Sequence, residues 1–269
     1  MIDKQKIIKH LQKGGFLFEL ECMKEFTKAG FDVEASLHYF DNKTERHREV
    51  DFVAYRNFYD KQNSFSFNVS LVVECKAHIS PILGISADTQ IGGMLSSANL
   101  LSSKNLNQLL KKIVENNDDS FTFGPRNSEQ IHQNVFEFST KENGKDRVFE
   151  SMIQSLNASL YLRNSSNKSD RRFGNIYIPV IIFDNALFSI NRDETEINVD
   201  KVSYIKASKF YAFDEMNPLK IFHIVSNENI LEYAKKIFNE ISVFYETYKT
   251  DINKIAEESP NSSGKRKYV

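Results

Sequence analysis

The stretch that decides the fold is Leu71-Val72-Val73-Glu74-Cys75-Lys76, together with the earlier segment Arg48-Glu49-Val50-Asp51-Phe52-Val53-Ala54. Both have the apolar, β-branched composition of short strands, yet each carries acidic residues. Residues two apart on a strand project from the same face, so Glu74 and Lys76 lie together, opposite the apolar residues of their strand. A carboxylate and an ammonium group are costly to bury there. With Asp51, they form a set that can hold a divalent metal and activate a water.

A helix and a further strand precede these two segments. Apolar side chains recur at helical spacing from Phe18 to Ala29, which predicts a helix over residues 16–29 with Gly30 as its C-cap. Residues 31–39 alternate and are rich in strand formers, which predicts the first strand. A helix followed by three strands, with acids on the second and third, is the beginning of an α/β core.

The remainder of the chain predicts one domain with an insertion. We expect residues 1–256 to form a single domain, 78–146 to be an inserted helical subregion, and 257–269 to be a disordered tail. The elements expected after residue 78 are helices at 86–97 and 100–115, a strand or helix at 130–138, a helix at 147–163, a hairpin over 176–190, strands at 202–213 and 219–225, and a helix at 229–248.

Composition narrows the protein class. The 269 residues suffice for one large domain, and a hydrophobic content of 41% permits a sizeable core. A net charge of −1 offers no general attraction for nucleic acid, so such a contact needs a local basic patch or a partner. The spacing of Cys22 and Cys75 fits neither a disulfide framework nor a zinc site, so both are expected to be buried apolar residues. Without a signal region or a run of about 18 apolar residues, we expect a cytoplasmic protein with no membrane contact.

The order of the acidic residues resembles a known nuclease family. Glu19 on a helix, Asp51 on a strand and Glu74-x-Lys76 on the next strand are similar to the pattern of the PD-(D/E)XK nuclease superfamily. Gly15-x-x-Phe18-Glu19, followed by Gly30-Phe31-Asp32-Val33, resembles the first-helix signature of Mrr-type restriction endonucleases. The resemblance implies an α/β fold with a restriction-endonuclease-like core: a central mixed β-sheet flanked by helices, here with a helical insertion.

The resemblance has a clear extent. Up to His78 it rests on these motifs, and beyond that residue it rests only on the order of elements. It departs from the nominal family pattern at Val50, where the family has a proline. A motif made of an aspartate, a variable spacer and Glu-x-Lys is short and degenerate. The resemblance therefore depends largely on the position of this motif on apolar strands that follow a matching helix.

The resemblance also implies roles for residues of this chain. Asp51, Glu74, Lys76 and Glu19 would be catalytic, and the metal ligands would be Asp51, Glu74, Glu19 and the backbone carbonyl of Cys75. The metal would be Mg²⁺, with Mn²⁺ able to replace it, because hard cations prefer oxygen ligands. Lys76 could orient or deprotonate the attacking water and offset charge on the phosphate. The implied activity is cleavage of DNA in restriction or anti-phage defence.

Other readings stay open at this point. Glu74 and Lys76 could be a structural pair, and the chain a catalytically inactive nuclease-fold binding or scaffold subunit of a nucleoprotein complex, or an RNA-directed nuclease. Expected partners are DNA and either a second copy, as a homodimer, or the other subunits of a larger defence complex. Weaker site candidates are Gln90, Gln154, His78, and the basic segments 46–48 and 168–172.

Overall fold

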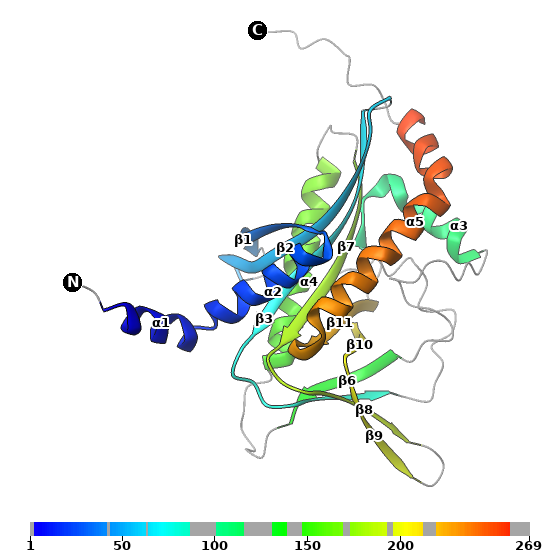
Figure 1. Ribbon diagram of the computed structural model, residues 1–269. Coiled ribbons are helices and arrows are strands. Elements are labelled where there is room, and N and C mark those ends of the chain that lie inside the picture. Colours follow the sequence, from blue (N-terminus) through cyan, green and yellow to red (C-terminus); the bar gives the residue numbers. More distant parts are fainter. Residues whose placement is uncertain are drawn as a thin grey trace.

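The computed structural model of the chain describes residues 3–41, 44–62, 64–86, 101–115, 131–138, 147–168, 173–192, 196–211 and 219–258. Within these ranges, the strands form one sheet in the order β1-β2-β3-β7-β11-β10-β6-β4-β8-β9, and β5 pairs with β7 beside this path. The sheet is mixed, and helices flank it (Figure 1). The predicted α/β architecture with a large mixed sheet between helices is therefore confirmed.

The strands are β1 (Asp32–Asp41), β2 (Arg46–Asp60), β3 (Phe65–Lys76), β4 (Ile82–Ser86), β5 (Leu101–Ser102), β6 (Ile131–Glu137), β7 (Phe173–Phe183), β8 (Leu187–Arg192), β9 (Ile197–Val202), β10 (Tyr204–Phe210) and β11 (Leu219–Ser226). The α-helices are α1 (Lys4–Lys13), α2 (Phe16–Ala29), α3 (Asn107–Glu115), α4 (Arg147–Lys168) and α5 (Ile230–Glu258), with 3-10 turns at Lys104–Leu106 and Asn227–Asn229.

The first three strands form an antiparallel meander. β2 pairs with β1 on one side and with β3 on the other, and its pairing with β3 runs from Asp60 opposite Phe65 to Phe52 opposite Val73. These segments are rich in valine and phenylalanine, which fit a pleated surface that is buried on at least one face. The predicted helix and three strands are confirmed, with β2 longer at both ends than its apolar core suggested.

β3 and β7 form the centre of the sheet. They pair in parallel over nearly their whole length, from Ser66 opposite Phe173 to Lys76 opposite Phe183. A parallel connection needs a crossover, and α4 lies between the two strands in sequence. β7 also pairs in parallel with β11, and ten of its eleven residues are buried, as expected for a strand covered on both faces.

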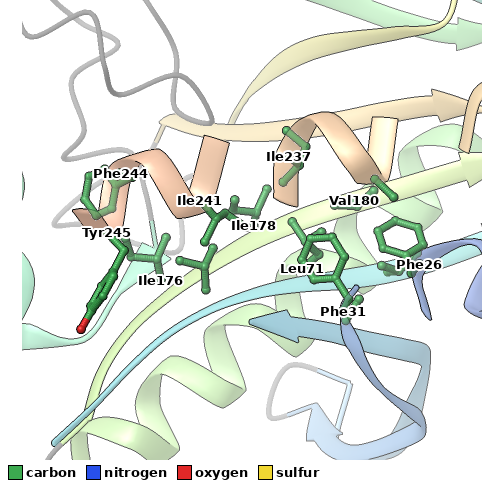
Figure 2. Close-up of a cluster of buried hydrophobic side chains, with 14 of the residues drawn as sticks. Phe26, Phe31, Leu71, Ile176, Ile178, Val180, Ile237, Ile241, Phe244 and Tyr245 are labelled. Atoms are coloured by element: carbon green, nitrogen blue, oxygen red, sulfur yellow. The ribbon is translucent and has the colours of Figure 1, made fainter. Parts of the chain in front are cut away.

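One face of the sheet packs against α2, α3 and α5. Figure 2 shows Leu71 of β3 and Ile178 of β7 directed toward this layer, with Phe26 of α2 and Ile237 and Ile241 of α5 packed around them. The apolar residues of α5 recur every three or four positions, so one stripe of this long helix is buried. This cluster fixes α2 against the strands that carry the acidic residues.

The opposite face packs against α4, which lies behind the strands in Figure 1. Val148, Met152 and Leu156 of α4 are fully buried in this second cluster, together with Val72 of β3. The hydroxyl of Ser155 donates a hydrogen bond of 2.7 Å to the carbonyl of Val72, which ties the helix to the strand. β3 is thus held between two helical layers, and Lys76 at its end is partly exposed.

The structure corrects the predicted helical character of the 78–146 insertion. The described part of that region contains β4, β5 and β6 as well as α3, and β4 pairs with both β6 and β8. The reason is that Ile82, Ile85 and Ile131 belong to short alternating apolar runs, which are strand patterns too brief to identify with confidence in sequence. The predicted helix at 86–97 lies outside the described residues except Ser86, which ends β4.

The predicted hairpin over 176–190 is also wrong. β7 and β8 are consecutive in sequence, but β7 pairs with β3, β5 and β11, whereas β8 pairs with β4 and β9. The polar pair Asp184-Asn185 makes a change of direction between distant parts of the sheet. Of the predicted tail, residues 259–269 lie outside the described residues, and Glu257 and Glu258 belong to α5.

Two local predictions hold. Gly30 ends α2 as predicted, with a left-handed backbone (φ 104°) whose N–H donates to the carbonyls of Phe26 and Thr27. Cys22 and Cys75 are both free and buried, as expected.

In the part of the chain described, none of the helices has the length and apolar content that crossing a bilayer requires.

Candidate active site

α2 packs so that Glu19 lies at the end of β3. Cys22, one turn after Glu19, is fully buried in the same hydrophobic cluster as Cys75 of β3. Gly15, which begins α2 with a left-handed backbone (φ 83°), lies at the same end. A Cβ built on Gly15 would be 3.6 Å from the Cβ of Ala77 and 3.9 Å from Oε1 of Glu19. The first turn of α2 therefore borders the residues that follow Lys76.

The register between β2 and β3 brings the next acid to the same place. The ladder between β2 and β3 ends at the pair of Phe52 and Val73. Extending the register by one step sets Asp51 opposite Glu74. The ladder is replaced at that point by a side-chain contact. The backbone N–H of Cys75 donates a hydrogen bond of 2.6 Å to Oδ2 of Asp51. Asp51 is therefore held against the Glu74-Cys75-Lys76 segment.

Glu74 is a fully buried carboxylate. Its Oε1 is in direct ionic contact with the Nζ of Lys76, whose side chain is 30% exposed. Its Oε2 is buried and has no hydrogen-bond partner. A buried carboxylate oxygen without a partner is energetically unfavourable, so this oxygen is chemically suited to bind a cation.

The carboxylates repel one another. Burial, and then repulsion from Asp51, raise the pKa of Glu74 to about 8 against the opposing effect of Lys76. Burial and repulsion from Asp51 likewise raise the pKa of Glu19 to about 7. Burial also raises the pKa of Asp51, although the N–H of Cys75 and the charge of Lys76 oppose the shift. Burial, together with repulsion between carboxylates, thus keeps these pKa values high, and carboxylates perturbed in this way are typical of functional sites.

Lys76 remains a cation. Burial alone would lower its pKa, but the attraction of Glu74 and the hydrogen bond that Lys76 donates to it outweigh burial and raise the pKa above its ordinary value. A lysine that holds its proton this firmly does not accept one from water at neutral pH. In this arrangement Lys76 is suited to offset charge, and the role of base is better served by a carboxylate.

The side chains are close enough to influence each other's ionisation, but they are not arranged as a finished ligand set. Over the described ranges, no three His, Cys, Asp or Glu side chains form a group that could hold a metal ion as they stand. Glu74 is directed to Lys76 and Asp51 to the N–H of Cys75. The residues nevertheless fit a hard divalent cation, because carboxylate oxygens are its preferred ligands and Oε2 of Glu74 lacks any partner.

Several residues of this region were not predicted. Glu49, two residues before Asp51, raises the pKa of both Asp51 and Glu19 and so adds to the negative charge. The amide of Gln154 on α4 donates a hydrogen bond of 2.8 Å to the carbonyl of Glu49, which fixes the strand beside Asp51. Gln154, a weak candidate in the sequence, thus has a positional role. The sequence did carry a signal for Glu49, because this residue lies two positions before Asp51 on the same strand.

Asp184 fixes the turn after Lys76. Its backbone N–H donates to the carbonyl of Lys76 at 3.2 Å, and its carboxylate accepts the backbone N–H groups of His78 and Ile79. The guanidinium of Arg147 donates to the carbonyl of His78 at 2.9 Å. His78 is exposed and has a left-handed backbone (φ 59°), which these contacts hold in place. The side chain of His78 has no role that this geometry reveals.

Of the other candidates that the structure describes, Arg48 pairs with a carboxylate outside the site. Arg48, from the basic segment 46–48, forms an ion pair of 3.1 Å with Asp41. Gln90 and residues 169–172 of the second basic segment lie outside the described residues, and Lys168 is the exposed last residue of α4.

Comparisons of the chain with protein-family models, with curated proteins and with solved structures give no match. The functional argument therefore depends on the residues themselves.

Proposed function

We propose that this protein is a metal-dependent endonuclease that hydrolyses phosphodiester bonds of DNA. The observation that carries the proposal is the fully buried carboxylate of Glu74, with one oxygen unpartnered, beside Asp51 and Lys76. The resemblance of Glu19, Asp51 and Glu74-x-Lys76 to the PD-(D/E)XK pattern supports the same conclusion, since helix, strand and strand meet at one end of β3.

The proposed metal is Mg²⁺, replaceable by Mn²⁺. Asp51 and Glu74 would hold it, with the carbonyl of Cys75 and Glu19 as further oxygen ligands. When bound, it would supply positive charge and Lewis acidity at the scissile phosphate. A bound cation would also offset the burial and the carboxylate repulsion that raise the pKa values of Asp51 and Glu74.

The protein side chains divide the remaining work. Lys76, which contacts Glu74, keeps its proton, and its Nζ would offset charge on the phosphate. Glu19 is partly exposed, and its carboxylate, which has a pKa of about 7 without metal, would join the ligand set in its ionised form. Asp184 and Gln154 hold the two strand segments that carry Lys76 and Asp51.

The proposed setting is the destruction of foreign DNA, in restriction or anti-phage defence, within the cytoplasm. This part of the proposal rests on the family resemblance alone. Cutting both strands of a duplex requires two sites, so the working form would be a homodimer or a larger complex in which this chain is the nuclease subunit.

A plasmid-nicking assay tests the proposal. Supercoiled plasmid is incubated with the protein and Mg²⁺, Mn²⁺ or chelator, and single-stranded RNA is added as a competitor. Asp51→Asn and Glu74→Gln should abolish nicking, whereas Asp200→Asn and Glu232→Gln, which neutralise exposed carboxylates on β9 and α5, should leave it unchanged. Nicking that persists in chelator, or in Asp51→Asn at the wild-type rate, would show that the site is not the catalyst.

The ionic contact of Glu74 with Lys76 also favours a second candidate, a nuclease-fold binding subunit in which this pair is structural. That protein would bind nucleic acid but cut neither DNA nor RNA with any divalent metal. Preferential inhibition of nicking by RNA, with cleavage of the competitor, would instead indicate an RNA-directed nuclease.

A further inference from the structure

α1 concentrates positive charge in a chain whose net charge is −1. Residues 4–18 contain four lysines and one histidine, and no aspartate or glutamate. At 100° per residue, Lys6, Lys9 and Lys13 fall on one face of the helix, and His10 lies beside them. The apolar side chains of α1 occupy the opposite face, so the helix has one continuous basic stripe.

The basic stripe is open to solvent. The four lysines of α1 are exposed, and Figure 1 shows the helix extending away from the sheet and the other helices. Ile7 and Ile8, on the apolar side, are 47% and 41% exposed, so they are only partly covered. α1 is thus an arm of the molecule, with α2 as its packed continuation.

The arm is joined to the molecule next to the candidate site. Gly14-Gly15 connects α1 to α2, and Gly15 borders Ala77 and Glu19. Lys13 is two residues from Gly15, so their Cα atoms are at most about 7 Å apart. The stripe from Lys13 to Lys6 then extends about 10 Å further along the helix.

The site itself needs such charge. Glu19, Glu49, Asp51 and Glu74 are all carboxylates, and the ammonium group of Lys76 is already in contact with Glu74. A polyanionic substrate approaching this end of β3 meets repulsion unless positive charge nearby compensates. A duplex presents about one phosphate per 1.7 Å of axis, so a stripe of about 10 Å can face several phosphates.

We propose that α1 is a nucleic-acid-binding arm, whose stripe of Lys6, Lys9 and Lys13 holds backbone phosphates that flank the bond at the site. The inference rests on the proposed nuclease function. It adds that substrate affinity comes mainly from sequence-independent, salt-sensitive contacts made by this helix. A basic amphipathic helix can also bind an anionic membrane surface, and the proximity of α1 to the site favours nucleic acid.

The test compares two triple variants of the full chain. Lys6→Gln/Lys9→Gln/Lys13→Gln neutralises the stripe, and Lys235→Gln/Lys249→Gln/Lys254→Gln removes the same charge from exposed positions of α5. Binding of a fluorescein-labelled DNA duplex is measured in chelator over a salt series, so that no cleavage occurs. We expect the α1 variant to bind at least about tenfold more weakly at about 0.1 M salt, with a salt slope smaller by about two to three. The α5 variant should bind within about twofold of wild type.

Each outcome decides the inference. Equal weakening of both variants would show that only net charge matters, and unchanged binding of the α1 variant would show that the arm does not contact DNA. If the α1 lysines control binding to vesicles of phosphatidylserine and phosphatidylcholine but not to DNA, the arm is a membrane anchor and the inference is wrong. The nicking assay separates the two proposals: a protein that binds through α1 but never cuts refutes the nuclease function alone. A protein that cuts equally well without the stripe refutes the arm alone.

Discussion

The backbone N–H of Cys75 and the carboxylate of Asp51 are joined by a hydrogen bond of 2.6 Å. This contact attaches β2 to β3 at the point where the regular ladder between them has ended. Glu74 and Lys76 are the chain neighbours of Cys75, so one hydrogen bond sets Asp51 beside both. The carboxylate of Asp51 therefore has a structural partner as well as a proposed catalytic duty, and substitutions can separate the two.

Asp51→Asn keeps an oxygen that can accept the N–H of Cys75, whereas Asp51→Ala leaves this N–H without its partner. We expect both variants to lose about 10²–10³-fold or more in metal-dependent cleavage. Only Asp51→Ala should lose about 1–3 kcal/mol of unfolding free energy, which urea denaturation measures. Equal stability of the two variants would contradict the importance of this hydrogen bond.

Lys76→Met leaves the buried carboxylate of Glu74 without its counter-charge. We expect this variant to be less stable than wild type by about 1–3 kcal/mol at pH 8, because Glu74 must become protonated or remain unpaired. The double variant Lys76→Met/Glu74→Gln should regain most of that stability and still fail to cut. A double variant that is as unstable as the single one would show that loss of the lysine acts through packing.

The metal-free protein should become less stable as pH rises. The pKa values of Glu19 and Glu74 are raised from 4.5 to about 7 and about 8, so the folded state binds more protons than the unfolded state between these limits. Unfolding free energy then falls as pH increases from 4.5 toward 8, and is level above this window. Thermal melts in chelator measure the trend, and Glu74→Gln should flatten it. A stability that instead rises over this window would contradict the raised pKa values.

Metal binding should release protons at neutral pH. Glu74 and Glu19 are partly protonated at pH 7, and a metal binds the ionised carboxylates. Titration calorimetry with Mn²⁺ in buffers of different ionisation enthalpy should give about one proton or more per ion at pH 7, and close to none at pH 9. An enthalpy that does not depend on the buffer at pH 7 would exclude these two residues as ligands.

Gly30→Ala tests the packing that places α2. The residue has φ 104°, and a Cβ there would approach the ring of Phe238 on α5 to 2.9 Å. We expect a loss of about 1–3 kcal/mol in urea denaturation, from backbone strain and this close contact. Lys24→Ala, at an exposed position of the same helix, is the control and should have little effect. If Gly30→Ala were as stable as the control, the end of α2 would be freer to move than these contacts indicate.

The part of the fold that sequence could predict is the part built from long periodic segments. α2, the β1–β3 meander, α4 and α5 each bury a regular stripe or alternate along several residues, and local pattern was sufficient for them. β4 and β6 are short and joined to distant strands, so their patterns carry little information. The separation of β7 from β8 could not be foreseen either, because strand order is decided by which apolar faces meet in three dimensions.

The same division applies to the site. Asp51, Glu74 and Lys76 could be predicted as candidates because charged residues interrupt apolar strands, which is a purely local signal. The positions of Gln154 and Asp184 depend on how α4 and the end of β7 meet β2 and β3, and no neighbour in sequence reports this. The protonation state of Lys76 could not be predicted from the sequence either, because it depends on burial and on the contact with Glu74.

The pairing of β3 with β7 has a consequence for the making of the protein. Glu74 lies opposite Ile181, and more than a hundred residues separate the two in the chain. Closing so long a loop is slow, and it cannot begin before the second strand exists. A chain still on the ribosome therefore lacks one wall of its site until β7 has emerged. The sheet around the candidate site can therefore be completed only after about two thirds of the chain has been synthesised.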